Sequence, residues 1–225
     1  MSGGKIKGVA PGANLAAVRV LDSRGTGRLG CMLEGIRWIL EHRKEYSIRI
    51  VNISVGSAGK YQGEESKLIK AVNAMWDAGL IVCIAAGNEG SRGDSVTSPG
   101  TCRKAITVGS YDDFLMIDEK GKRFEHYSGK GPTRECICKP EIVAPGTNII
   151  STNAMKGKTD YPYTVKSGTS MSTPIVSGAA ALLLEKYPDM TNINVKLRLR
   201  ETAKDCGLPQ NHQGWGRLSI TELLA

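Results

Sequence analysis

Residues 168–174 read Gly-Thr-Ser-Met-Ser-Thr-Pro, and a run of apolar residues from Ile175 to Leu184 follows them. Gly168 permits a sharp turn and a close approach of the backbone, and the apolar run predicts a buried helix. Pro174 is expected in the first turn of that helix, where amide donors are free in any case. Ser170 would then lie where free N–H groups and the helix dipole favour a negatively charged oxygen, which makes it a candidate nucleophile. The same stretch, taken alone, also fits a simple turn with a helix N-cap.

A second stretch offers a partner for this serine. Residues 80–86 form a short continuous apolar run, which is typical of a strand buried on both faces, and Gly87-Asn88 follows it directly. Ligand sites of α/β sheets lie beyond the carboxyl ends of the strands. An Asn88 carboxamide at this place can donate a hydrogen bond to a developing oxyanion, with Gly87 leaving room for a substrate. The alternative is a turn asparagine that tolerates a left-handed backbone.

A third stretch, residues 48–55, predicts another buried strand, which ends in Gly56-Ser57. Its carboxyl end, formed by Ser54, Val55 and Gly56, is expected to present an open backbone edge with which an extended peptide can pair. The alternative is an ordinary strand end.

Strands and helices alternate along the chain, which predicts an α/β fold with a mostly parallel sheet and helices on both faces, in three layers. The expected strands cover residues 15–21, 48–55, 80–86, 101–110 and 141–143, and residues 163–166 lead to Ser170. The expected helices cover residues 29–43, 66–78, 170–187 and 192–202, with a short segment near 218–224 and a turn at 118–122 between two arms. A chain of 225 residues with 40% hydrophobic residues can bury one sizeable core, so we expect one domain over residues 1–225.

Together these stretches resemble the subtilisin-like serine proteases, the subtilases. Residues 168–174 look like the family's nucleophile motif, residues 85–90 like its oxyanion-hole segment, and residues 52–56 like the strand that lines its specificity pocket. Further similar segments follow in family order, at residues 8–13, 127–132, 143–146 and 214–218.

The resemblance implies a subtilisin-like fold and peptide-bond hydrolysis through an acyl-enzyme. Ser170 would attack the scissile carbonyl, and the Asn88 side chain with the Ser170 amide would hold the oxyanion. The substrate-binding residues that the resemblance implies are Ser54, Val55, Gly56, Gly87, Gly168 and Thr169.

Two parts of the family's catalytic triad have no counterpart in this sequence. The family places an aspartate in an Asp-Thr/Ser-Gly setting and a histidine in a His-Gly-Thr-His setting, both before the segment that here begins at Gly8. Asp22 resembles a strand exit, and His42, His126 and His212 have no suitable context for a general base. We therefore expect a catalytic domain that is incomplete at its N-terminus and nearly inactive alone. The family's aspartate strand lies between the strands expected at residues 15–21 and 48–55, so an open slot is expected there.

Other ligands and partners leave few marks on the sequence. The resemblance implies that calcium can bind, without naming ligands in these residues, and it implies a cis peptide bond before Pro99. Six cysteines in a chain of this length are not a disulfide framework, and their spacing is not that of a zinc site. The net charge of +8 is scattered and no recognition motif accompanies it, so we expect no nucleic-acid partner. We expect no membrane span either, because no eighteen-residue apolar run occurs, and localisation stays open.

Three functions therefore stay open. The first is a truncated subtilisin-like serine endopeptidase domain that acts on peptides or proteins without a required cofactor. The second is a non-catalytic subtilase-like module that binds peptides or serves as a scaffold. The third is one half of a split protease, whose N-terminal segment or second chain supplies the aspartate and the histidine.

Overall fold

The computed structural model describes residues 6–56, 62–90, 92–114, 116–117, 121, 123–154 and 162–225. Within these residues, the main sheet has four parallel strands in the order β1 (Ile50–Ile53), β2 (Ile81–Ala85), β3 (Ile106–Ser110) and β6 (Ile142–Ala144). Two small antiparallel pairs accompany it: β4 (Met116–Ile117) with β5 (Arg123–Phe124), and β7 (Ile149–Thr152) with β8 (Tyr163–Lys166). The parallel main sheet confirms the predicted fold class.

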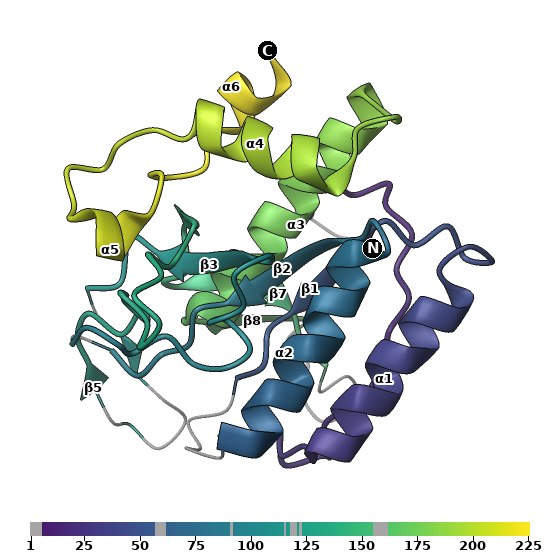
Figure 1. Ribbon diagram of the computed structural model, residues 1–225. Coiled ribbons are helices and arrows are strands. Elements are labelled where there is room, and N and C mark those ends of the chain that lie inside the picture. The colour runs from purple at the N-terminus through teal and green to yellow at the C-terminus, as the bar shows by residue number, and fades with distance from the viewer. Residues whose placement is uncertain are drawn as a thin grey trace.

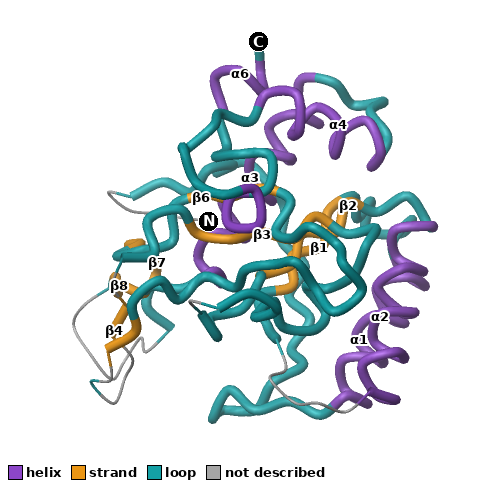
Figure 2. The backbone as a smooth tube through the Cα atoms, turned by 60° about the vertical axis from the view of Figure 1, so that its left-hand side comes forward, coloured by secondary structure: helices purple, strands orange, loops and turns teal. Residues whose placement is uncertain are grey.

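Helices cover both faces of this sheet. Helices α1 (Leu29–His42) and α2 (Gln62–Asp77) pack on one face, and α3 (Thr169–Lys186), α4 (Asn192–Thr202) and α6 (Ile220–Leu224) pack on the other (Figure 1). A single short turn of helix, α5 (Gln210–Gln213), lies outside these layers. Figure 2 shows α1 and α2 side by side, well apart from α4 and α6. The predicted three-layer arrangement is therefore confirmed.

Strand β2 explains how one apolar run serves two cores. All five of its residues are buried. Ile81 and Cys83 join the core on the α3 side, whereas Val82 and Ile84 join the core under α1 and α2. Alternate side chains of a strand point to opposite faces, so a strand between two helical layers needs apolar residues throughout. Each fully buried aliphatic side chain contributes roughly 1.5–3 kcal/mol relative to an exposed one.

One expected strand is wrong. Residues 15–21 form no strand, and none of the described strands pairs with them. A strand needs a neighbour to take up its backbone hydrogen bonds. Val18 and Val20 lie against Gly35 of α1, where an added Cβ would come within 3.0 and 2.9 Å of their methyl groups.

Several boundaries also differ from the prediction. Strand β3 begins at Ile106, because turns carry the chain from Thr97 to Cys102: Gly100 N–H donates to Thr97 O (2.7 Å) and Cys102 N–H donates to Pro99 O (2.9 Å). Helix α3 begins at Thr169, so Pro174 lies in its second turn and not in the first. The arms β4 and β5 are confirmed, while most of the turn expected at 118–122 lies outside the described residues. The predicted bounds of α4 are confirmed.

The described helices include none that is both long enough and apolar enough to cross a lipid bilayer.

Candidate active site

The nucleophile candidate lies at the N-terminus of α3. Gly168 precedes the helix with a φ of 138°, a conformation that residues with a Cβ rarely adopt. A Cβ on Gly168 would lie 3.1 Å from Nδ2 of Asn88. The glycine therefore serves both the turn and the close contact, and it places Ser170 in the first turn of the helix, near the positive end of the helix dipole.

Asn88 is fastened to the start of this helix. Its Oδ1 atom accepts hydrogen bonds from the Thr169 N–H (2.9 Å) and from Thr169 Oγ1 (3.1 Å). The Gly87 N–H in turn donates to Thr169 Oγ1 (3.1 Å). With two donors on its oxygen, the carboxamide is held with its NH₂ group as the end that can donate to a substrate. The structure thus brings Gly87, Asn88 and Gly168 together around Thr169, the residue that precedes Ser170.

The Ser170 hydroxyl meets the carboxyl end of β1. Ser170 Oγ donates to the carbonyl oxygen of Ser54 (3.0 Å). Asn52 Nδ2 donates to Ser54 Oγ (2.8 Å), and Asn52 Oδ1 accepts from Ser177 Oγ of α3 (3.0 Å). The strand end that was predicted to bind substrate is therefore tied to the nucleophile helix at two points. Val55 and Gly56 follow Ser54 in the chain. Because β1 and β2 run parallel, this segment lies at the same end of the sheet as the segment after β2, which carries Gly87 and Asn88.

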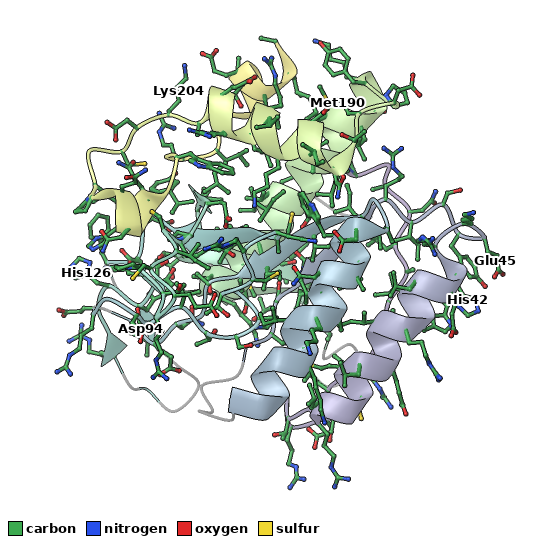
Figure 3. All side chains as sticks on the ribbon, in the orientation of Figure 1. His42, Glu45, Asp94, His126, Met190 and Lys204 are labelled. Atoms are coloured by element: carbon green, nitrogen blue, oxygen red, sulfur yellow. The ribbon has the colours of Figure 1, made fainter. Side chains whose placement is uncertain are left out.

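The hydrogen bond of the Ser170 hydroxyl goes to a carbonyl oxygen and not to a histidine. His42 Nδ1 bonds the Trp38 carbonyl oxygen within α1 (2.9 Å), and its ring stacks on the Trp38 ring at 4.6 Å. His126 faces Asp113, with 3.6 Å between Nδ1 and Oδ1. Figure 3 shows His42 and His126 on opposite sides of the molecule. His212 lies in α5, where burial and the nearby Lys130 hold the pKa of its imidazole below the usual value. A main-chain carbonyl is thus the acceptor of the Ser170 proton, and it is no general base.

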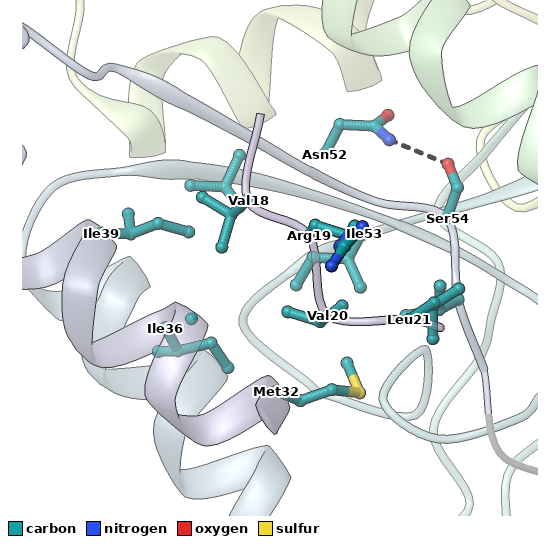
Figure 4. A pocket seen from close by; sticks show the side chains of 13 residues that line it. Val18, Arg19, Val20, Leu21, Met32, Ile36, Ile39, Asn52, Ile53 and Ser54 are labelled. Atoms are coloured by element: carbon teal, nitrogen blue, oxygen red, sulfur yellow. Dashed lines mark hydrogen bonds between the residues drawn. The ribbon is translucent and has the colours of Figure 1, made fainter. Parts of the chain in front are cut away.

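A cavity of about 370 Å³ lies beside β1 (Figure 4). Val18 and Val20 line one side of it, β1 lines the other, and Ile36 and Ile39 of α1 are among the apolar side chains between them. The cavity stands where the sequence predicted an open slot in the sheet. The edge of β1 that faces away from β2 has no partner strand among the described residues.

The loop before α3 is held by a residue that the sequence analysis missed. Asp112 accepts hydrogen bonds from the Gly146 N–H (2.7 Å) and the Thr147 N–H (3.2 Å). The Gly146 carbonyl oxygen accepts from the Gly168 N–H (2.9 Å). Asp112 therefore holds Gly146, and Gly146 in turn holds Gly168 at the start of α3. Its only sequence signal was its place just after a strand, which many aspartates share.

Two further predictions concern this region. The Ser98–Pro99 peptide bond is cis, as the resemblance implied. Within the described part of the chain, no three His, Cys, Asp or Glu side chains gather in a way that could hold a metal ion, so we assign no calcium ligand.

Known proteins are similar to this chain in sequence. Serine protease AprX of Bacillus subtilis (strain 168) is 39% identical over 213 residues, which cover 88% of this chain and 48% of that protein. Subtilisin E of the same strain is 36% identical over 204 residues, which cover 90% of this chain and 47% of that protein. The chain thus spans about half the length of these curated relatives.

Solved structures give the same result. The S41 psychrophilic protease superposes with a TM-score of 0.74 at 28% identity and covers 94% of this chain and 70% of its own. Sphericase superposes with a TM-score of 0.74 at 27% identity and with the same coverage. The family model of the subtilases matches residues 1–216. This chain therefore belongs to the subtilase family, the subtilisin-like serine proteases.

Proposed function

We propose that this chain is the nucleophile-bearing part of a subtilisin-like serine endopeptidase, that it is nearly inactive alone, and that a polypeptide segment outside it supplies the triad aspartate and histidine. One observation carries the proposal: Thr169 fastens the Asn88 carboxamide beside Ser170 at the N-terminus of α3. A helix N-cap has no need of a carboxamide from a separate strand end, whereas an oxyanion hole requires one or more donors held in advance.

The chemistry follows from these positions. Ser170 Oγ would attack the carbonyl carbon of an extended peptide, with Asn88 Nδ2 and the Ser170 N–H donating to the oxygen as it becomes negative. The amine would leave with a proton, and water would then release the acyl group from Ser170. Both steps need a base that accepts and returns a proton. In subtilisin the loss of the serine or of the histidine alone costs about 2 × 10⁶ in kcat, so a chain without the base should be nearly inert.

The cavity beside β1 fits the rest of the proposal. An extended segment that entered it could bond to the free edge of β1, while its alternate side chains covered Ile36 and Ile39 of α1. A segment parallel to β1 would end near Ser54, whose carbonyl oxygen touches Ser170 Oγ. We propose that the occupant is the aspartate-bearing strand of the completing segment, in the same polypeptide or in a second chain.

A complementation assay tests this function. The chain is produced alone and together with a polypeptide that carries the family's Asp-Thr/Ser-Gly and His-Gly-Thr-His segments, and hydrolysis of a chromogenic peptide is followed. We expect hydrolysis only from the pair, and none from the pair with Ser170→Ala. Equal hydrolysis with Ser170→Ala would contradict the proposal.

The second candidate is a non-catalytic module that binds peptides, and the pairing of the Ser170 hydroxyl with a main-chain carbonyl favours it. A stable pair of polypeptides that binds peptides without hydrolysing them would support this alternative.

A further inference from the structure

A buried lysine lies at the amino ends of β3 and β6. The Lys139 side chain is fully buried, and its ammonium group donates to the carbonyl oxygens of Cys102 (2.6 Å) and Ala105 (3.3 Å). It also donates to Oε1 of Glu141 (2.6 Å), the residue directly before β6. A charge taken out of water is costly unless it is paired and hydrogen-bonded, and these three oxygens meet that need.

The Glu141 carboxylate joins this lysine to the sheet and to α4. Its Oε2 atom accepts a hydrogen bond from the Thr107 N–H of β3 (2.8 Å). A second ammonium group, that of Lys196 in α4, donates to Oε1 (3.1 Å) and to the Ala105 carbonyl oxygen (3.0 Å). Lys196 is the more exposed of the two lysines. The cluster therefore holds two positive charges and one negative charge, and Glu141 would keep one cationic partner without Lys139.

The geometry requires the charged form of Lys139. Burial lowers the pKa of this side chain, and the nearby Glu141 carboxylate opposes that shift. A neutral amine has only two N–H groups, and its lone pair would have to face one of the three oxygens. The ammonium form satisfies all three. Cys102 and Lys139 are 37 positions apart in the sequence, so this one charge holds together two separate segments of the chain.

The same oxygens are a ligand set for a metal ion. Main-chain carbonyl oxygens and a carboxylate are the groups that bind potassium and other hard cations. A potassium ion has about the size of an ammonium ion and carries the same charge. A divalent ion would add a further positive charge beside the Lys196 ammonium, so the surroundings favour a monovalent ion.

We propose that the Lys139 ammonium takes the place of a metal ion in an oxygen-lined site, and that this site binds a monovalent metal ion once the ammonium is removed. An ion that binds from solution stabilises a protein only at sufficient concentration, whereas a tethered ammonium is always present. The join between Cys102, Ala105 and Glu141 is therefore independent of dissolved cations. The site lies at the amino ends of the strands and does not involve Ser170, so the inference does not depend on the proposed function.

Thermal unfolding of Lys139→Ala tests the inference. The variant and the unaltered chain are unfolded in the chlorides of potassium, ammonium, calcium and tetramethylammonium at one ionic strength. Tetramethylammonium is too large for the site and donates no hydrogen bond, so it serves as the reference. Once potassium or ammonium reaches about ten times the dissociation constant of the site, we expect Lys139→Ala to unfold about 3–6 °C higher than in the reference salt. The unaltered chain measures the general effect of each salt, and the shift is counted relative to it.

Two further variants support the test. Lys104→Ala removes an exposed ammonium group that pairs with Asp77, so it loses the same charge as Lys139→Ala without opening the site. It should show no shift specific to potassium or ammonium. Lys139→Met fills the space of the lysine stem with an unbranched apolar chain and leaves only the ammonium position free. It is the second test variant, and the same shift is expected if Lys139→Ala does not fold.

Three results would overturn the inference. The first is an equal effect of potassium on the folded test variants and on the unaltered chain, because the oxygens would then hold no ion. The second is a larger gain from calcium than from potassium, because the site would then not match the single charge of the ammonium. The third is failure of both Lys139 variants to fold in every salt, because an ion that replaced the ammonium would restore folding. Each of these results leaves the proposed function standing.

Discussion

The two edges of the main sheet are made of the same backbone but have different surroundings. At the β6 edge, the Val143 N–H donates to Gly216 O (3.0 Å) and the Leu218 N–H donates to Val143 O (2.8 Å), so the segment through Arg217 closes the sheet. At the β1 edge, no described strand takes up the free backbone groups, and a cavity of about 370 Å³ lies there instead. Free strand edges recruit partners. The difference places the free edge next to the candidate nucleophile, because Ser170 Oγ donates to the carbonyl oxygen of Ser54, directly after β1.

The largest expected contrast is in thiol reactivity. Cys83 of β2 faces the core on the α3 side, and burial raises the pKa of its thiol to about 12, whereas Cys31 of α1 is exposed. Only the thiolate reacts, and at pH 8 a thiol with this pKa is about 10⁻⁴ ionised. We expect iodoacetamide to modify Cys31 at least about 10³ times faster than Cys83, as measured by peptide mass spectrometry. Similar rates would show that the core between the sheet and α3 opens readily.

A second contrast concerns activity of the completed enzyme. Asn88→Ala should lower kcat for peptide hydrolysis by about 10²–10³, because one oxyanion donor is lost. Asn194→Ala, on an exposed part of α4, is the matched control and should leave kcat unchanged. An unchanged rate in Asn88→Ala would show that Asn88 is not an oxyanion donor.

The cost of cavities should also differ between the two sides. Leu183→Ala in α3 removes a fully buried side chain from the closed core and should lower the free energy of unfolding by about 2–5 kcal/mol. Ile39→Ala borders on a space that is already open and should cost less than about 2 kcal/mol. Urea denaturation measures both. Equal costs would mean that the space between β1 and α1 is as closely packed as the core under α3.

The smallest effect is expected from added volume. Ala180→Leu forces extra atoms into the closed core under α3 and should destabilise the chain by about 1–3 kcal/mol. Ile39→Phe can extend into the cavity and should change the free energy of unfolding by less than about 1 kcal/mol. Thermal unfolding of the two variants compares them, and an equal loss in Ile39→Phe would contradict an open slot.

The sequence predicted the helices and the buried strands well, because their signals are local. The apolar face of α1 marks this helix without reference to the rest of the chain. The error at residues 15–21 has the opposite cause. Val18 and Val20 carry a strand-like pattern, but strand pairing depends on a neighbour that no local pattern reports.

The candidate site divides in the same way. Short motifs identified Ser170 and Asn88, and the structure places them at one end of the sheet, joined through Thr169. Asp112 was missed, because it acts through contacts with residues distant in sequence. Its residue type is ordinary for loops, so only the fold shows what it touches.

The central claim is that Ser170 is a nucleophile that lacks its base in this chain, and its rate of reaction with a fluorophosphonate probe tests this most directly. The unaltered chain and Ser170→Ala are exposed to the probe, alone and with the polypeptide that carries the missing aspartate and histidine, and intact mass is recorded over time. We predict slow labelling of the chain alone, fast labelling of Ser170 in the pair, and none in Ser170→Ala. Fast stoichiometric labelling of Ser170 in the chain alone would contradict the account, since it would require a base among the groups already present.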